Sequence, residues 1–263
     1  MQHARELDEL RRSVIPGVRK IAILRANGIG DFIFTLPALE ALRAAYPDAE
    51  IVLLGKRWHA EFLHERPGPI DRVVVVPPCR GVTLPPDAED DPTELDRFVS
   101  AMRRECFDLA IQLHGGGRYS NPLALQFGAR VTIGLRAPDV PALDRWIPYV
   151  YYQSEIHRYL EVMSLIGAAP VTLEPRLSVT ERDRAGSLAV LPETREALVV
   201  LHPGAGARPA LFRSARRARQ RAADPRARER SAGRLRGGAR PAAGERRDPQ
   251  QPRQHPHGHG ALG

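Results

Sequence analysis

The sequence predicts an α/β fold in which a parallel sheet is flanked by helices. Short segments that are apolar on both faces alternate with stretches of helical periodicity between residues 19 and 166. Strands that read as continuous apolar runs are typical of a sheet covered by helices on both sides. The chain has 263 residues, of which 43% are apolar, so it can bury a hydrophobic core and is not disordered throughout.

The individual elements follow from local pattern. A buried apolar run predicts a strand at 19–25, and the loop 26–30 follows it. Leu36, Leu39 and Leu42 share one face of a helix predicted at 35–46, which Pro47 ends. The same alternation continues with strand 50–54, helix 57–65, strand 71–76, helix 93–105, strand 108–113 and helix 156–166. We expect Cys106 to be a small buried residue beside the helix 93–105.

A loop rich in proline and acids, 77–92, follows the strand 71–76. It lies where an open α/β sheet binds its ligands, at the carboxyl ends of the strands. A solvated loop without a ligand is the alternative for its individual acids.

The excess of positive over negative charge lies at the end of the chain. The formal net charge is +8, but residues 207–263 alone carry 15 arginines and 4 acids, so residues 1–206 have a net charge of −3. The large apolar side chains of 207–263 are Leu211, Phe212, Leu235 and Leu262, too few to offset the cost of ordering, and we expect a disordered tail. The tail could bind nucleic acid or anionic surfaces, act as a passive linker, or be an out-of-frame translation of a GC-rich gene. We favour the third interpretation, because the composition changes beside a loop that normally leads into a helix, and we expect no specific nucleic-acid partner.

The rest of the composition points to the cytoplasm. Two cysteines, Cys79 and Cys106, cannot form a disulfide framework, and no apolar run approaches the ~20 residues of a membrane span. Residues 1–12 are charged and lack the apolar stretch of a signal peptide. A helix predicted at 4–14 either caps the sheet or docks on a membrane surface.

A glycine-containing loop, Arg25-Ala-Asn-Gly-Ile-Gly-Asp31, joins the first strand to a helix. It is a poor dinucleotide motif, because Ile33 stands where a third glycine belongs and no acid ends the strand 50–54. We therefore expect no NAD and no other cofactor. Asp31 is placed either to cap the helix or to act on a ligand.

The longer string from Ile23 to Arg43, followed by Tyr46-Pro47, resembles the family 9 glycosyltransferases, which include the ADP-heptose:lipopolysaccharide heptosyltransferases. Its pattern is Arg, Ile-Gly-Asp, Thr-x-Pro and Ala-Leu-Arg, then Tyr-Pro. Further resemblance lies in 108–118, 128–134, 157–160 and His202-Pro-Gly-Ala-Gly206, so that about residues 18–206 are covered.

The resemblance implies two Rossmann-like domains facing each other, the GT-B arrangement, and transfer with inversion and without a metal. Asp31 would be the general base. The acceptor would be bound by Arg25, Asn27, Gly28, Gly30, Gln112, His114, Arg118 and Asn121. The phosphates of an ADP-heptose-like donor would be bound by His202, Gly204, Ala205 and Gly206. The acceptor would be a glycan or glycolipid such as a lipopolysaccharide core, reached by peripheral contact with the inner face of the cytoplasmic membrane.

The domain organisation follows: an N-terminal extension (1–17), a Rossmann-like acceptor-side domain (18–170), a linker with the first strand and loop of a donor domain (171–206), and the tail (207–263). No Trp-Pro follows Gly206, where the family continues with a basic residue and a helix. We therefore predict a glycosyltransferase that has little or no activity as written. The alternative is a non-catalytic α/β binding module whose polycationic tail binds nucleic acid or anionic glycolipid.

Overall fold

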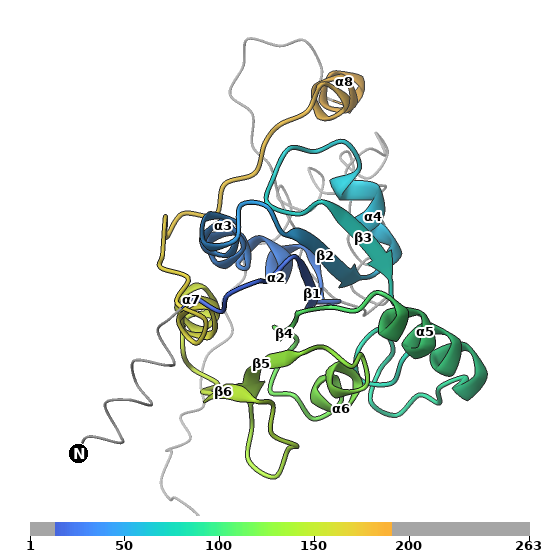
Figure 1. Cartoon of the computed structure of the whole chain (residues 1–263). Coiled ribbons are helices and arrows are strands. Elements are labelled where there is room, and N and C mark those ends of the chain that lie inside the picture. Colours follow the sequence, from blue (N-terminus) through green and yellow to red (C-terminus); the bar gives the residue numbers. More distant parts are fainter. Residues whose placement is uncertain (1–13, 191–263) are drawn as a thin grey trace, which may run out of the picture. The chain divides into compact units, whose positions relative to one another are not determined.

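One sheet of parallel strands forms the centre of the part of the chain that the computed structural model describes, residues 14–190 (Figure 1). Its strands are β1 (Lys20–Leu24), β2 (Glu50–Gly55), β3 (Arg72–Val75), β4 (Leu109–Gln112), β5 (Val131–Arg136) and β6 (Arg145–Pro148). Their order in the sheet is β3-β2-β1-β4-β5-β6, and all neighbouring pairs are parallel. The predicted Rossmann-like α/β fold is confirmed.

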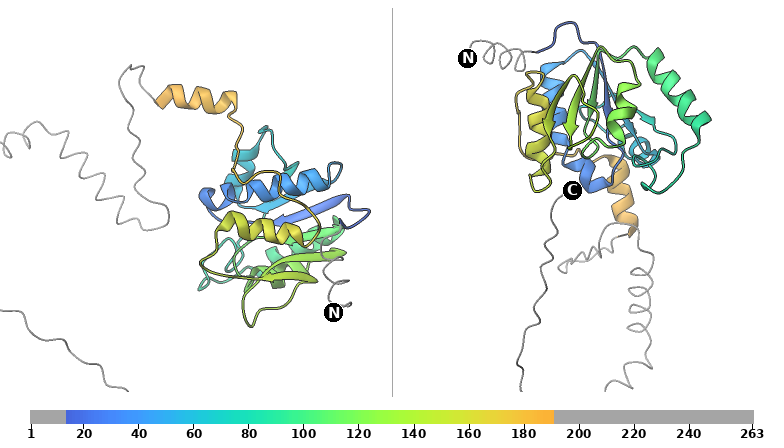
Figure 2. Two further views of the ribbon diagram at one scale, coloured as in Figure 1. Left: turned by 90° about the vertical axis from the view of Figure 1, so that its left-hand side faces the viewer. Right: turned by 90° about the horizontal axis from the view of Figure 1, so that it is seen from below.

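Helices cover both faces of this sheet. They are α2 (Ile29–Ile33), α3 (Leu36–Ala45), α4 (Arg57–Leu63), α5 (Pro92–Arg104), α6 (Ser120–Leu125) and α7 (Glu155–Ser164). A further helix, α8 (Glu181–Val190), buries none of its residues. Helices α3 and α7 lie side by side on one face, whereas α5 and α6 cover the other (Figure 2). No helix of residues 14–190 is long and apolar enough to cross a membrane.

Each of the strands β1 to β4 contributes to two separate cores. Ile21 and Ile23 of β1 belong to the core that contains α3 and α7, and Ala22 and Leu24 belong to the core that contains α5 and α6. Alternate side chains of a strand point to opposite faces, so two buried faces require the continuous apolar runs seen in the sequence. In the register, Ile21 pairs with Ile51 of β2 on one side and with Leu109 of β4 on the other.

A sharp corner joins α2 to α3. The buried hydroxyl of Thr35 donates to the carbonyl of Phe32 at 2.6 Å, at the end of α2. Pro37 occupies the first turn of α3, where its missing N–H leaves no helical hydrogen bond unmade. Thr35 and Pro37 of the Thr-x-Pro motif therefore build this corner.

Four elements were not expected from the sequence, namely α6, β5, β6 and α8, the last of which lies in the predicted linker region. The helix that Asp31 was expected to open is a separate short one, α2. The prediction for Cys106 was wrong. This side chain is exposed, because the chain turns away at the end of α5 and Cys106 adopts a left-handed backbone conformation with φ of 51°.

Candidate active site

The sheet has a topological switch point between β1 and β4. These neighbouring parallel strands continue at their carboxyl ends into loops that lead to helices on opposite faces, α2 and α6. Open α/β sheets bind ligands at such a point. The loops beginning at Arg25 and at Leu113 are therefore the candidate site, and both contain residues predicted for it.

Asp31 lies in the first turn of α2, beside this switch point. Its Oδ2 accepts the backbone N–H of Gly28 at 3.1 Å, which caps the helix, and its Oδ1 lies 3.8 Å from Nη2 of Arg25. The side chain is 48% exposed. One carboxylate oxygen therefore has a structural task, and the group as a whole remains accessible to a ligand.

Arg25 has its guanidinium inside the protein, with the side chain only 2% exposed. Nη1 donates to the carbonyl of Leu113 at 2.5 Å, and Nη2 donates to the carbonyl of Asp31 at 2.9 Å. The guanidinium also lies over the ring of Tyr159, 4.9 Å from its centroid. Arg25 thus joins the two loops of the switch point to each other and to α7.

Glu155, Arg158 and Tyr159 of α7 complete this environment, and none of them was predicted as a site residue. Glu155 places Oε2 3.5 Å from Nη2 of Arg25, and it accepts hydrogen bonds from Arg158 and from the hydroxyl of Tyr159. Arg158 and Tyr159 are each 1% exposed. The spacing Glu155-x-x-Arg158 at the start of a helix was the available signal, because an acid and a base three residues apart lie on one helix face.

The side chains of Gln112 and Asn121 lie on the inner side of the loop after β4. Gln112 donates to the carbonyl of His114 at 2.7 Å and to Ser120 Oγ at 2.5 Å, and its Oε1 accepts the N–H of Leu135 at 3.1 Å. Asn121 donates to the carbonyl of Leu135 at 3.1 Å. Both side chains are fully buried, so these two predicted acceptor residues shape the loop from inside the protein.

His114 connects the two loops. Its Nδ1 accepts the N–H of Ala26 at 3.2 Å. Burial, followed by the charge of Arg25, lowers the pKa of His114 to about 4, although a hydrogen bond with the backbone of Gly81 opposes the shift. The imidazole is therefore neutral at pH 7 and offers hydrogen bonds rather than charge.

The remaining predicted residues of this edge differ in their exposure. Gly28 and Gly30 are exposed, and a Cβ at Gly30 would meet no atom within 4 Å, so open space lies beside the loop. Asn27 has a buried Oδ1 with no hydrogen-bond partner among the described residues. Arg118 is exposed, with its guanidinium 5.8 Å from the centroid of the Tyr119 ring. The predicted donor residues His202, Gly204, Ala205 and Gly206 lie outside the described residues.

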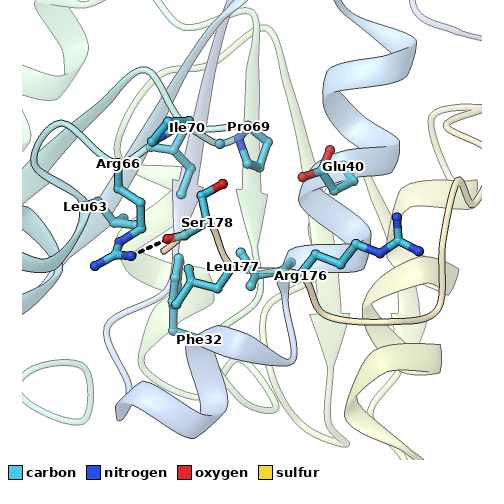
Figure 3. A pocket seen from close by; sticks show the side chains of 12 residues that line it. Phe32, Glu40, Leu63, Arg66, Pro69, Ile70, Arg176, Leu177 and Ser178 are labelled. Atoms are coloured by element: carbon cyan, nitrogen blue, oxygen red, sulfur yellow. Dashed lines mark hydrogen bonds between the residues drawn. The ribbon is translucent and has the colours of Figure 1, made fainter. Parts of the chain in front are cut away.

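Two cavities lie beside α4, and Asp31 lines neither of them. One, of about 270 Å³, has an apolar centre that includes Phe32, Ile70 and Leu177; Arg66 lies at one end, and Glu40 and Arg176 lie at the other (Figure 3). The other, of about 320 Å³, is lined from α4 and from the start of α8. The segment 176–183 crosses the domain here, and Arg66 pairs with Asp183 at 2.7 Å. The two cavities are therefore gaps between this segment and the rest of the domain. The switch point is therefore the better candidate for a reaction site.

Comparisons with known proteins find a similar fold among the solved structures. The sequence matches no protein-family model and no curated protein. Among solved structures, the glycosyl transferase family 9 from Veillonella parvula DSM 2008 superposes with a TM-score of 0.54 at 19% identity, over 67% of this chain and 50% of that one. E. coli heptosyltransferase WaaC with ADP-2-deoxy-2-fluoro heptose gives 0.46 at 19% identity, over 66% and 55%. E. coli ADP-heptose lps heptosyltransferase II gives 0.44 at 19% identity, over 66% and 51%.

The superposition with the Veillonella parvula structure confirms the expected resemblance at the level of the fold. The chain spans about half the length of these solved structures. The activity of a whole transferase therefore does not follow from the shared fold alone.

Proposed function

We propose that the described residues are the acceptor-side domain of an inverting, metal-independent glycosyltransferase with the GT-B arrangement. The observation that carries the proposal is Asp31, a half-exposed carboxylate at the switch point of the sheet and 3.8 Å from the buried Arg25. The fold shared with a family 9 structure supports the same class of reaction. The proposed donor is ADP-heptose or a similar nucleotide-sugar, and the proposed acceptor is a lipopolysaccharide core or another glycan.

The reaction gives Asp31 the task of general base. The carboxylate accepts the proton of an acceptor hydroxyl while that oxygen attacks the anomeric carbon of the donor sugar. The bond from this carbon to the phosphate oxygen breaks, and ADP leaves from the opposite face with the electron pair, so the configuration is inverted. Arg25 holds the backbone and the carboxylate of Asp31, and the exposed Gly28 and Gly30 leave room for the acceptor.

The donor side depends on the segment 202–206. His202, Gly204, Ala205 and Gly206 would contact the donor phosphates through backbone N–H groups at the start of a helix. The arginine-rich segment 207–263 offers too few apolar residues to build the rest of such a domain. We therefore propose that this chain as given transfers sugar slowly or not at all. A glycolipid acceptor would place the working enzyme in the cytoplasm, in peripheral contact with the membrane.

The experiment begins with the gene. Codons 195–215 are resequenced and all three reading frames are translated downstream. We expect one frame to continue with a basic residue, Trp-Pro and further βα pattern, and we call the product of that frame the frame-restored protein. Transfer of heptose from ADP-heptose to a heptose-free lipopolysaccharide is then measured for both proteins. If no frame continues in this way and 207–263 is the true product, the transferase proposal fails in favour of the binding module.

A further inference from the structure

Two buried guanidinium groups share a single carboxylate at the start of α7. Arg25 and Arg158 are 2% and 1% exposed, and the Nε atom of each has no hydrogen-bond partner among the described residues. Glu155 lies between them, with Oε2 3.5 Å from Nη2 of Arg25 and Oε1 bonded to Nη1 of Arg158. A buried cation is costly unless it is paired, so the charge of Glu155 is needed here.

The ion pair with Arg158 uses only one of the two carboxylate oxygens of Glu155. The Nη2 atom of Arg158 also donates to the carbonyls of Tyr151 and Gln153, at 3.2 and 3.1 Å, and so fastens the loop before α7. The second oxygen of Glu155 faces the other way, toward Arg25 and the hydroxyl of Tyr159. Because the Tyr159 ring also lies under the guanidinium of Arg25, α7 holds Arg25 by a charge and by an aromatic face.

The same nitrogen of Arg25 reaches Asp31. Nη2 donates to the Asp31 carbonyl at 2.9 Å and lies 3.8 Å from its Oδ1, while it lies 3.5 Å from Glu155. The two carboxylates therefore face the same nitrogen atom. Their nearest oxygens, Oδ1 of Asp31 and Oε2 of Glu155, are separated by at most about 7 Å. The titratable and charged groups around Asp31 include Arg25 after β1, Glu155 of α7 and His114 after β4.

We propose that Glu155 is a positioning residue for Asp31: by sharing Arg25 with it, Glu155 fixes where the Asp31 carboxylate stands and how strongly Arg25 attracts it. The proposal rests on the proposed function only in treating Asp31 as the base. The competing explanation is structural, in which Glu155 merely neutralises Arg158 and has no electrostatic effect on Asp31.

The test is the titration of Asp31 in the full chain, followed by NMR of ¹³C-labelled carboxyl groups. In Glu155→Gln, Asp31 loses a like charge across the shared cation, and we expect its pKa to fall by about 0.5–1.5 pH units, as Coulomb's law gives for ~7 Å at an intermediate dielectric. Glu161→Gln, an exposed acid on the same helix, is the control and should leave the Asp31 titration unchanged. A Glu155→Gln variant that melts earlier but whose Asp31 titrates as in the unmodified chain, or at higher pH, overturns the proposal.

The reverse experiment protects the test if Glu155→Gln does not fold. Coupling between two sites is reciprocal, so Asp31→Asn should lower the pKa of Glu155 by the same amount. Asp31 is half exposed, so this replacement removes a charge without emptying a core position. An unchanged Glu155 titration overturns the proposal. The titrations do not depend on sugar transfer. If Asp31 and Glu155 are coupled but Asp31→Asn leaves the transfer rate of the frame-restored protein unchanged, the proposed function fails and this inference stands.

Discussion

At the scale of single residues, the side chains of the string from Arg25 to Tyr46 have different tasks. Arg43 donates to the carbonyls of Pro47 and Ala49, at 3.0 and 2.7 Å, and to the carboxylate of Asp71 at 2.5 Å. It therefore ties the end of α3 to the segments that lead into β2 and β3. Arg25 is buried with its hydrogen bonds directed into the protein, whereas Asp31 remains half exposed. Of these two charged side chains at the switch point, Asp31 is therefore the one that a substrate can reach.

His59 gives a pH-dependent prediction. Burial lowers the pKa of this histidine to about 4, and its Nε2 has no partner among the described residues. The unfolded chain binds a proton near pH 6.5 and the folded one only near pH 4, so the stabilisation is complete above pH 6.5 and is lost as the pH falls toward 4. When the pH falls from 7 to 5.5, we expect the free energy of unfolding of His59→Phe to decrease by about 1 kcal/mol less than that of the unmodified chain, as measured by urea unfolding.

His64 supplies the comparison, because it is exposed. His64→Phe should leave the pH dependence between 7 and 5.5 as it is in the unmodified chain. If His59→Phe shows the same loss of stability with pH as the unmodified chain, His59 is not held neutral by burial.

At the scale of elements, the backbones of β4 and β5 approach closely at Gly134. A Cβ there would lie 2.5 Å from the carbonyl oxygen of Gln112 and 2.8 Å from its Cβ. Gln112 in turn holds the loop that carries His114. The close packing of β4 against β5 therefore affects the loop at the candidate site, through the side chain of Gln112.

Gly134→Ala should accordingly destabilise the domain by about 2 kcal/mol or more, because backbone atoms cannot move aside as a flexible side chain can. Chemical unfolding measures the loss. Gly186→Ala in α8 is the control, since a Cβ at Gly186 meets no atom within 4 Å, and it should be neutral or slightly stabilising. Equal stability of the two variants would contradict the close approach of β4 and β5.

Elements with a clear apolar pattern were predictable from the sequence, and elements without one were not. The helix predicted at 93–105 is α5, at Pro92–Arg104, and the strand predicted at 50–54 is β2, at Glu50–Gly55. The edge strand β6 has four partly exposed residues and hence no continuous apolar run. For the site, Asp31 was found from a motif, whereas Glu155 was missed because its importance comes from Arg25, 130 positions away along the chain. Local pattern contains no information about such a contact.

At the scale of the whole molecule, charge and fold are separated along the chain. Residues 207–263 carry the positive charge, and the described Rossmann-like domain lies before them. The account in which the tail is an out-of-frame product predicts that its sequence has no specific task.

A comparison of three proteins tests this prediction. The full chain, residues 1–206, and a chain whose residues 207–263 are scrambled are titrated with a polyanion at several salt concentrations. We expect residues 1–206 to bind weakly and the native and scrambled tails to bind alike, because counterion release depends on the number of charges and not on their order. Tighter binding by the native tail than by the scrambled one would favour the binding module.

The most direct test of the central claim is the single-turnover rate of heptose transfer by the frame-restored protein, with Asp31→Asn compared with Asp48→Asn. Asp48 is an exposed acid in the turn after α3, so it shares the chemistry of Asp31 but not its place. The account predicts that Asp31→Asn lowers the rate by about 100-fold or more with little change in KM, and that Asp48→Asn stays within about twofold. A loss of only a few-fold in Asp31→Asn, or a frame-restored protein that transfers no heptose, would contradict it.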